Sequence, residues 1–245
     1  MLRNLFPRHS LGLAATLSVL SLALGTSRAV AGIVVSRATS FPTSPDLTVI
    51  DDTQDDGSVT LHTDRRLTQT FQVASGFTID KFYIDTTSLV ANKSFTVSIF
   101  SVSDTNAGAP NAVPTVTTNL LTTTSATTPS TGSGNVLEFD LTGSDEIFLA
   151  ATTGSAGYAL QLNRTEADGA FIWRLHESGD GTGGGTVGPD LYAAGQAYGT
   201  ALGGGFTHGN SDYTLAFTAV PEPSTFALAA LGVLGLIGLG RRRKR

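Results

Sequence analysis

Short segments in which apolar and polar residues alternate occupy most of the chain between residues 32 and 219. In residues 94–100, for example, Phe95, Val97 and Ile99 fall on one face and hydroxyl-bearing side chains fall on the other. A repeat of two residues is typical of strands with one buried face. The same pattern recurs at residues 67–73, 77–84, 136–141, 158–163, 170–175 and 211–218. No part of this region has a convincing 3.6-residue repeat with helix caps, so we expect an all-β fold.

Eight to ten such strands over residues 32–219 predict a single antiparallel β-sandwich of the jelly-roll type. Turn residues between the strands and an even composition favour one domain. Residues 32–45 are mixed in character, and we expect them to lead into it. Residues 115–133 hold 12 Ser and Thr in 19 positions, a composition that suits either an edge-strand hairpin or a flexible loop. We expect part strand and part exposed loop.

The charge of the chain is unevenly distributed. The formal net charge is −5 overall, but residues 32–220 carry 7 Lys and Arg against 19 Asp and Glu, which gives 7 − 19 = −12. An acidic surface repels phosphate backbones, so we expect no nucleic-acid partner. The chain has no cysteine, which excludes disulfides, thiolate metal sites and cysteine nucleophiles.

The first 31 residues have the three parts of a secretory signal. Arg3 and Arg8 provide positive charge, residues 11–24 form an apolar stretch, and Ala29 and Ala31 are the small residues that signal peptidase accepts. Fourteen apolar residues are few for a membrane-spanning helix. We therefore predict a signal peptide over residues 1–31 that is cleaved after Ala31; an uncleaved anchor helix is the alternative.

The last 25 residues have the opposite order. A Pro221-Glu222-Pro223 turn precedes an apolar, Gly-rich stretch, which we expect to form a short transmembrane helix over about residues 225–240. A basic tail of Arg241, Arg242, Arg243, Lys244 and Arg245 closes the chain. Positive residues stay on the cytoplasmic side of a membrane, so the tail would hold the domain outside, at the inner membrane.

This ending resembles the PEP-CTERM sorting signal of Gram-negative bacteria, and the resemblance covers residues 220–245. It implies that an exosortase, a membrane protease-like transpeptidase, recognises the tail and cuts near Pro221-Glu222-Pro223. The protein would then move from the inner membrane to the cell surface or the extracellular space. An ordinary tail anchor is the alternative interpretation.

A second resemblance covers the middle of the chain. A Gln-x-Phe pattern at Gln69 and Phe71, and an Asp-x-x-x-x-Phe pattern at Asp212 and Phe217, resemble signatures of choice-of-anchor extracellular domains. Such domains commonly precede PEP-CTERM tails. The resemblance implies a β-sandwich displayed outside the cell, with a binding or matrix role.

The densest acidic segment suggests a cation site. Asp52, Gln54 and Asp56, followed by Gly57, match the first half of a calcium-binding loop, in which oxygen ligands at positions 1, 3 and 5 precede a glycine. Position 12 is Thr63 instead of the required Glu, so the segment is not an EF-hand. Ca²⁺ is the only cofactor that the sequence suggests, and a solvated acidic turn is the alternative.

The single tryptophan has two interpretations. Trp173, together with Tyr192 or Tyr198, would make an aromatic platform on which a sugar ring could stack. Trp173 also shares a strand face with Phe171 and Leu175, which favours a place in the core.

No motif of a known catalytic site is convincing. The sequence lacks HExxH, GxSxG and P-loop patterns, and the GxGxxG match at residues 179–184 has no helical pattern after it. We therefore expect no enzymatic activity and no catalytic residues. The predicted function is a structural or adhesive role in an exopolysaccharide-associated envelope or biofilm matrix. A carbohydrate-binding module is the alternative, and a surface glycosidase is a weaker one.

Overall fold

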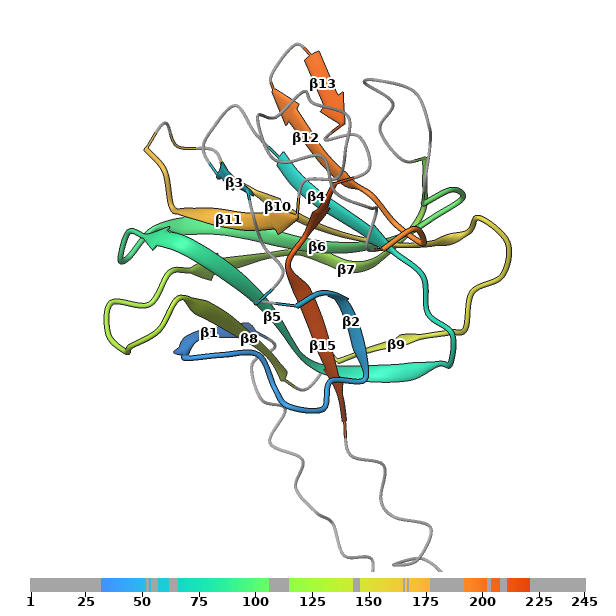
Figure 1. The fold of residues 1–245 in the computed structure, drawn as a ribbon, viewed down its shortest axis with the longest axis horizontal. Helices are drawn as coiled ribbons and strands as arrows, with labels where there is room; N and C mark the ends of the chain where they lie inside the picture. The colour runs from blue at the N-terminus through green and yellow to red at the C-terminus, as the bar shows by residue number, and fades with distance from the viewer. Residues whose placement is uncertain are drawn as a thin grey trace, which may run out of the picture.

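Fifteen strands, all paired antiparallel, build the part of the chain that the structure describes (Figure 1). The structure is a computed structural model, and the description covers residues 32–51, 53, 57–61, 66–105, 115–142, 146–164, 166, 168–176, 192–201, 204–207 and 211–220. The strands are β1 (Gly32–Ala38), β2 (Leu47–Ile50), β3 (Gly57–Thr60), β4 (Arg66–Phe71), β5 (Phe77–Leu89), β6 (Ser94–Val102), β7 (Val116–Thr127), β8 (Val136–Thr142), β9 (Ile147–Leu149), β10 (Gly157–Asn163), β11 (Phe171–His176), β12 (Ala197–Ala201), β13 (Gly204–Thr207), β14 (Asp212–Tyr213) and β15 (Leu215–Ala219).

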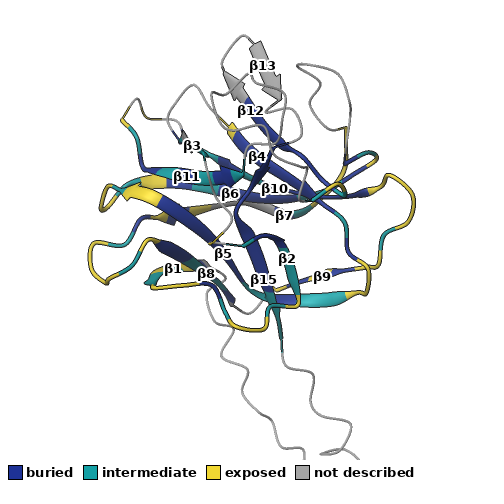
Figure 2. Cartoon of the chain, in the orientation of Figure 1, coloured by how far each residue is buried: buried dark blue, intermediate teal, exposed yellow. Residues whose placement is uncertain are grey.

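The strands form two sheets that pack face to face. One sheet has the order β1-β8-β5-β11-β14; in addition, β15 pairs with β2 and β5, β3 with β11, and β9 with β5. The other has the order β13-β12-β4-β10-β6-β7. Figure 2 shows the buried residues concentrated in the strands and the exposed residues mostly in the loops that join them. The predicted all-β sandwich is confirmed.

The 13-residue strand β5 organises the first sheet. Its first residues pair with β9, its middle pairs with β8 on one edge and β15 on the other, and its last residues pair with β11. Phe82 of β5 is completely buried and stacks on Phe139 of β8, with ring centroids 4.2 Å apart. Because four long-range neighbours share this strand, it sets the register of the whole sheet.

The alternating pattern explains most of the strands. Phe95, Val97 and Ile99 of β6 are buried as predicted, and all six other alternating runs overlap strands. Residues 32–45 differ from the expectation, because their first seven residues form β1 and pair with β8. This short strand keeps Ile33 in the core and leaves Val34 exposed, so its alternation is too brief to stand out. The Thr-rich segment is part strand, β7, and part loop, as expected.

Four residues join β4 of the second sheet to β14 and β15 of the first. The side-chain amide of Gln69 donates from Nε2 to Asp212 Oδ1 over 2.7 Å and accepts at Oε1 from the backbone N–H of Tyr213 over 2.6 Å. Two residues along β4 from Gln69, the ring of Phe71 faces that of Phe217 in β15, with centroids 4.8 Å apart. The four residues of the second resemblance, Gln69, Phe71, Asp212 and Phe217, thus meet in two inter-sheet contacts.

Thr214, between β14 and β15, holds the last strand against its neighbours. Its hydroxyl accepts from the backbone N–H of Asp85 over 3.1 Å and donates to the Arg174 carbonyl over 3.2 Å. Its carbonyl accepts from Trp173 Nε1 over 2.8 Å. The Trp173 ring also stacks on Tyr213 with centroids 4.3 Å apart. These contacts satisfy the buried indole N–H while the ring fills the core.

We predict that Phe71 and Phe217 stabilise the domain jointly. Phe71→Ala and Phe217→Ala should each lower the free energy of unfolding by about 3–5 kcal/mol, because each removes a completely buried ring. The double variant should lose less than the sum of the two, with a coupling of about 0.5–1.5 kcal/mol. Urea denaturation measures all three values, and exposed Val116→Ala is the control. Strictly additive losses would contradict a direct inter-sheet contact.

Candidate functional site

An open depression of about 510 Å³ lies at one end of the second sheet. Four loops meet there: the segments that follow β4 and β6, and the segments that precede β10 and β12. The lining residues are Gln72, Asp104, Thr105, Gly154, Ser155, Ala193 and Ala194. The antiparallel order β12-β4-β10-β6 places these loops side by side, so the depression follows directly from the sheet topology.

Buried hydrogen bonds form a rigid base beneath the loops. Thr70 Oγ1 donates to the carbonyl of Thr105 over 2.6 Å and accepts from the backbone N–H of Gln196 over 2.8 Å. The Tyr198 hydroxyl lies 3.2 Å from the same Thr105 carbonyl and 3.0 Å from Gln196 Oε1. The loops after β6 and before β12 are therefore fixed to β4 by side chains that water does not reach.

Further hydrogen bonds hold the walls. The Tyr192 hydroxyl lies 3.1 Å from the carbonyl of Gln72 and 3.0 Å from its backbone nitrogen, donating to the first and accepting from the second. The amide of Gln72 donates to the Gly154 carbonyl over 2.7 Å. Burial raises the pKa of Tyr192, with a smaller contribution from the negative charge of Asp212, so the hydroxyl stays protonated at neutral pH.

Two glycines permit the close approach of these segments. A Cβ on Gly195 would lie 2.0 Å from the carbonyl oxygen of Thr70, and a Cβ on Gly157 would lie 2.4 Å from that of Phe71. Backbone oxygens cannot move aside as flexible side chains can. Any other residue at either position would therefore push a loop away from β4 and change the shape of the depression.

The chemistry of the lining suits a polar, hydroxyl-rich ligand. It combines the amide of Gln72, the carboxylate of Asp104 and the hydroxyl of Ser155, whereas Thr105 lines the depression but is almost completely buried. Amides and carboxylates form hydrogen bonds in pairs with vicinal hydroxyl groups, and small residues such as Ala193 leave room for them. Among the described residues, the lining has one carboxylate, that of Asp104.

The aromatic platform predicted from the sequence is not formed. Trp173 is completely buried, and Tyr198 is almost completely buried, so neither presents a ring face to a sugar. The sugar-stacking prediction is wrong for both residues, and the alternative, that Trp173 belongs to the core, is confirmed. Tyr192 is half-buried, and its hydroxyl supports the wall of the depression.

The predicted calcium ligands Asp52, Gln54 and Asp56 lie outside the described residues. Their described neighbour Asp51 accepts hydrogen bonds at Oδ1 from both the backbone N–H and the hydroxyl of Thr53, each over 2.8 Å. Within the residues described, no three His, Asp or Glu side chains come together in a way that could hold a metal ion. Calcium binding at residues 52–56 stays a prediction.

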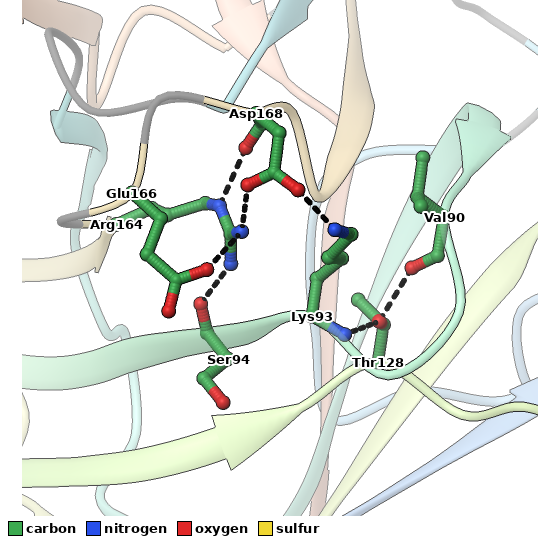
Figure 3. A network of polar contacts seen from close by, with 7 residues as sticks. All are labelled: Val90, Lys93, Ser94, Thr128, Arg164, Glu166 and Asp168. Atoms are coloured by element: carbon green, nitrogen blue, oxygen red, sulfur yellow. Dashed lines mark hydrogen bonds and ion pairs between the residues drawn. The ribbon is translucent and has the colours of Figure 1, made fainter.

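A second polar cluster ties the β10–β11 loop to the start of β6 (Figure 3). The guanidinium of Arg164 is completely buried, and its Nε donates to the Asp168 carbonyl over 2.6 Å. The same guanidinium pairs with the carboxylates of Glu166 and Asp168 and donates to the Ser94 carbonyl. Lys93 also pairs with Asp168. Hydrogen bonds from Lys93 and Arg164 lower the pKa of Asp168 from 3.8 to about 2.

Comparisons with known proteins identify the end of the chain. Residues 219–244 match the family model described as the PEP-CTERM protein-sorting motif. No curated protein matches the chain. The predicted sorting signal is confirmed, and the motif implies an exported protein that an exosortase processes and that is sorted to the cell surface. Most of the motif, residues 221–244, lies outside the described residues, as does the predicted signal peptide. In the part of the chain that is described, no helix is long and apolar enough to cross a membrane.

We predict that the Asp168 ion pairs stabilise the fold only where the carboxylate is charged. Its lowered pKa means that this stability is complete above about pH 4 and is lost as the pH falls through about 2. Asp168→Asn should therefore lower the thermal midpoint at pH 7, and the difference from the wild type should close between pH 4 and 2. Exposed Glu146→Gln controls for the loss of one negative charge. A difference that does not depend on pH in this range would contradict the ion pairs.

Proposed function

We propose that this exported protein is a non-enzymatic component of an exopolysaccharide-associated envelope, and that it contacts polymer through the depression at the end of the second sheet. The observation that supports the proposal is the depression itself, with the amide of Gln72, the carboxylate of Asp104 and the hydroxyl of Ser155 in its lining. Its volume of about 510 Å³ lies within the range of small-molecule sites. One or two sugar units of a chain fit such a space.

The hydrogen bonds that hold the loops of the depression support a binding role for it. Thr70, Gln196 and Tyr198 hold the loops from below, and Gln72 and Tyr192 hold the walls. A site that is already ordered loses little conformational entropy when a ligand binds. This matters for sugars, because each hydroxyl contact replaces a hydrogen bond to water and contributes little on its own.

Weak individual contacts suffice in a matrix. A polysaccharide repeats its units, and a surface carries many copies of a sorted protein, so many weak contacts act together. The structural or adhesive role proposed here requires this kind of reversible binding. It requires no catalytic group.

The two alternatives receive less support. An aromatic carbohydrate-binding module would use an exposed ring, whereas Trp173 and Tyr198 are buried. A glycosidase would use two carboxyl groups about 5–9.5 Å apart on either side of the scissile bond. Within the part of the chain that the structure describes, Asp104 is the one carboxylate of the lining.

We predict that blocking the depression abolishes polymer retention. Ala193 is exposed on its rim, so Ala193→Trp should fill it without disturbing the core, and Ala91→Trp, in the exposed turn after β5, is the matched control. Affinity electrophoresis through gels containing exopolysaccharide purified from the host culture measures retention. We expect Ala193→Trp to weaken retention at least tenfold while Ala91→Trp equals the wild type. Equal retention of all three proteins would refute this contact site.

A further inference from the structure

Among the aromatic side chains whose burial the structure describes, one is exposed to solvent. Phe148, in the short strand β9, is 63% exposed. Among the described residues the other exposed large hydrophobic side chains are aliphatic: Val34, Val90 and Val116. Its neighbours in the strand, Ile147 and Leu149, are buried. Because side chains alternate between the two faces of a strand, Phe148 projects outward.

The ring of Phe148 has a fixed place. A Cβ on Gly76 would lie 2.9 Å from Phe148 Cζ, so the ring rests against the backbone at Gly76, where any larger residue would displace it. The backbone of Phe148 is held in place because β9 pairs with the first residues of β5. The exposed ring is therefore a defined feature of the surface.

Phe148 lies where the chain leaves the domain. Thr78 of β5 is the register partner of Phe148 on one edge, and its carbonyl accepts from the backbone N–H of Val220 over 2.8 Å on the other. Two strand spacings, or about 10 Å, thus separate Phe148 from Val220. Gly32, the first residue after the predicted signal peptide, pairs with Thr142 at the same end of the sheet. β9 and the end of β15 both lie along the lower side of the fold in Figure 1.

The sequence places this end of the domain close to a membrane. The apolar stretch of the sorting tail starts at Phe226, so six Cα–Cα steps separate it from Val220. Six extended residues span at most about 21 Å. The headgroup layer on each side of a bilayer takes up about 5–7 Å of that distance. While the tail is inserted, the end of the sandwich that carries Phe148 is held at the bilayer surface.

We propose that Phe148 is a membrane contact: its ring enters the interfacial layer of the bilayer while the uncleaved tail anchors the protein. A partly exposed aromatic ring gains free energy when it leaves water, and the short tether keeps its local concentration at the membrane high. The contact holds the Pro221-Glu222-Pro223 segment at a constant height above the membrane, where a membrane protease would meet it. This inference depends on the sorting tail and is independent of the proposed polymer contact.

The surrounding charges indicate which lipid the contact accepts. Glu146, two residues before Phe148, is exposed, and residues 32–220 are strongly acidic. Anionic headgroups repel such a surface. The contact should therefore be strongest on zwitterionic phosphatidylcholine bilayers and weaken as anionic lipid is added at low salt.

Quenching by brominated lipids tests the contact. The full chain with Phe148→Trp is reconstituted in phosphatidylcholine vesicles whose acyl chains carry bromine near the headgroup. Native Trp173 is completely buried and gives a constant background. The control is Val90→Trp, which is also exposed and lies at the other end of β5, roughly 40 Å along the strand. Flotation of the vesicles checks that the tail has inserted in both variants.

We expect bromine to quench the added indole of Phe148→Trp at least twofold more than that of Val90→Trp. Equal quenching in floated vesicles would overturn the membrane contact while leaving the anchor intact. If the added indole is shielded from water only in membranes isolated from the host, and not in vesicles that contain no other protein, it contacts a protein partner and the membrane contact is overturned. Failure of the protein to float would overturn the anchoring itself, together with this inference.

Discussion

The inter-sheet contact between β4 and the last two strands is the interaction on which the domain depends. A buried carboxylate is stable only if hydrogen bonds replace its lost water, and Gln69 supplies one to Asp212 while its own oxygen accepts from Tyr213. The amide can satisfy both partners only when the two sheets stand in one register. The adjacent Phe71 and Phe217 rings fill the space between them. The hydrogen bonds of Gln69 thus specify how the two sheets align, and the burial of apolar side chains provides most of the stability.

This arrangement connects the fold to the sorting tail. β15 lies inside the first sheet, paired with β2 on one edge and β5 on the other, and the matched sorting motif begins at residue 219. Because β15 lies between two other strands, the first sheet is complete only with this last strand, directly before the tail. The same strand order brings Gly32 and Val220 to one end of the first sheet. The depression is built separately, from loops at the end of the second sheet.

The sequence predicts those features of the structure that depend on neighbouring residues, and misses those that depend on residues far apart in the chain. The alternation of residues 94–100 predicts β6 because one face is apolar throughout, whereas β1 offers only Ile33 and Val35 and is missed. Burial of Gln69 and Asp212 cannot be read from a pattern, since both residue types usually face water and their contact joins positions 143 apart. The depression escapes prediction for the same reason: its lining comes from four loops that only the sheet order brings together. The tail, by contrast, is recognised from its own contiguous residues.

The tail determines where the domain goes in the cell. The most direct test is the intact mass and cell fractionation of the protein expressed in its own host, compared with a variant in which Pro221, Glu222 and Pro223 are all alanine. The account predicts that the native protein loses both terminal segments and is found at the cell surface, while the variant keeps its tail and stays in the inner membrane. If both proteins keep the tail and remain in the inner membrane, the segment acts as an ordinary anchor and the account is contradicted.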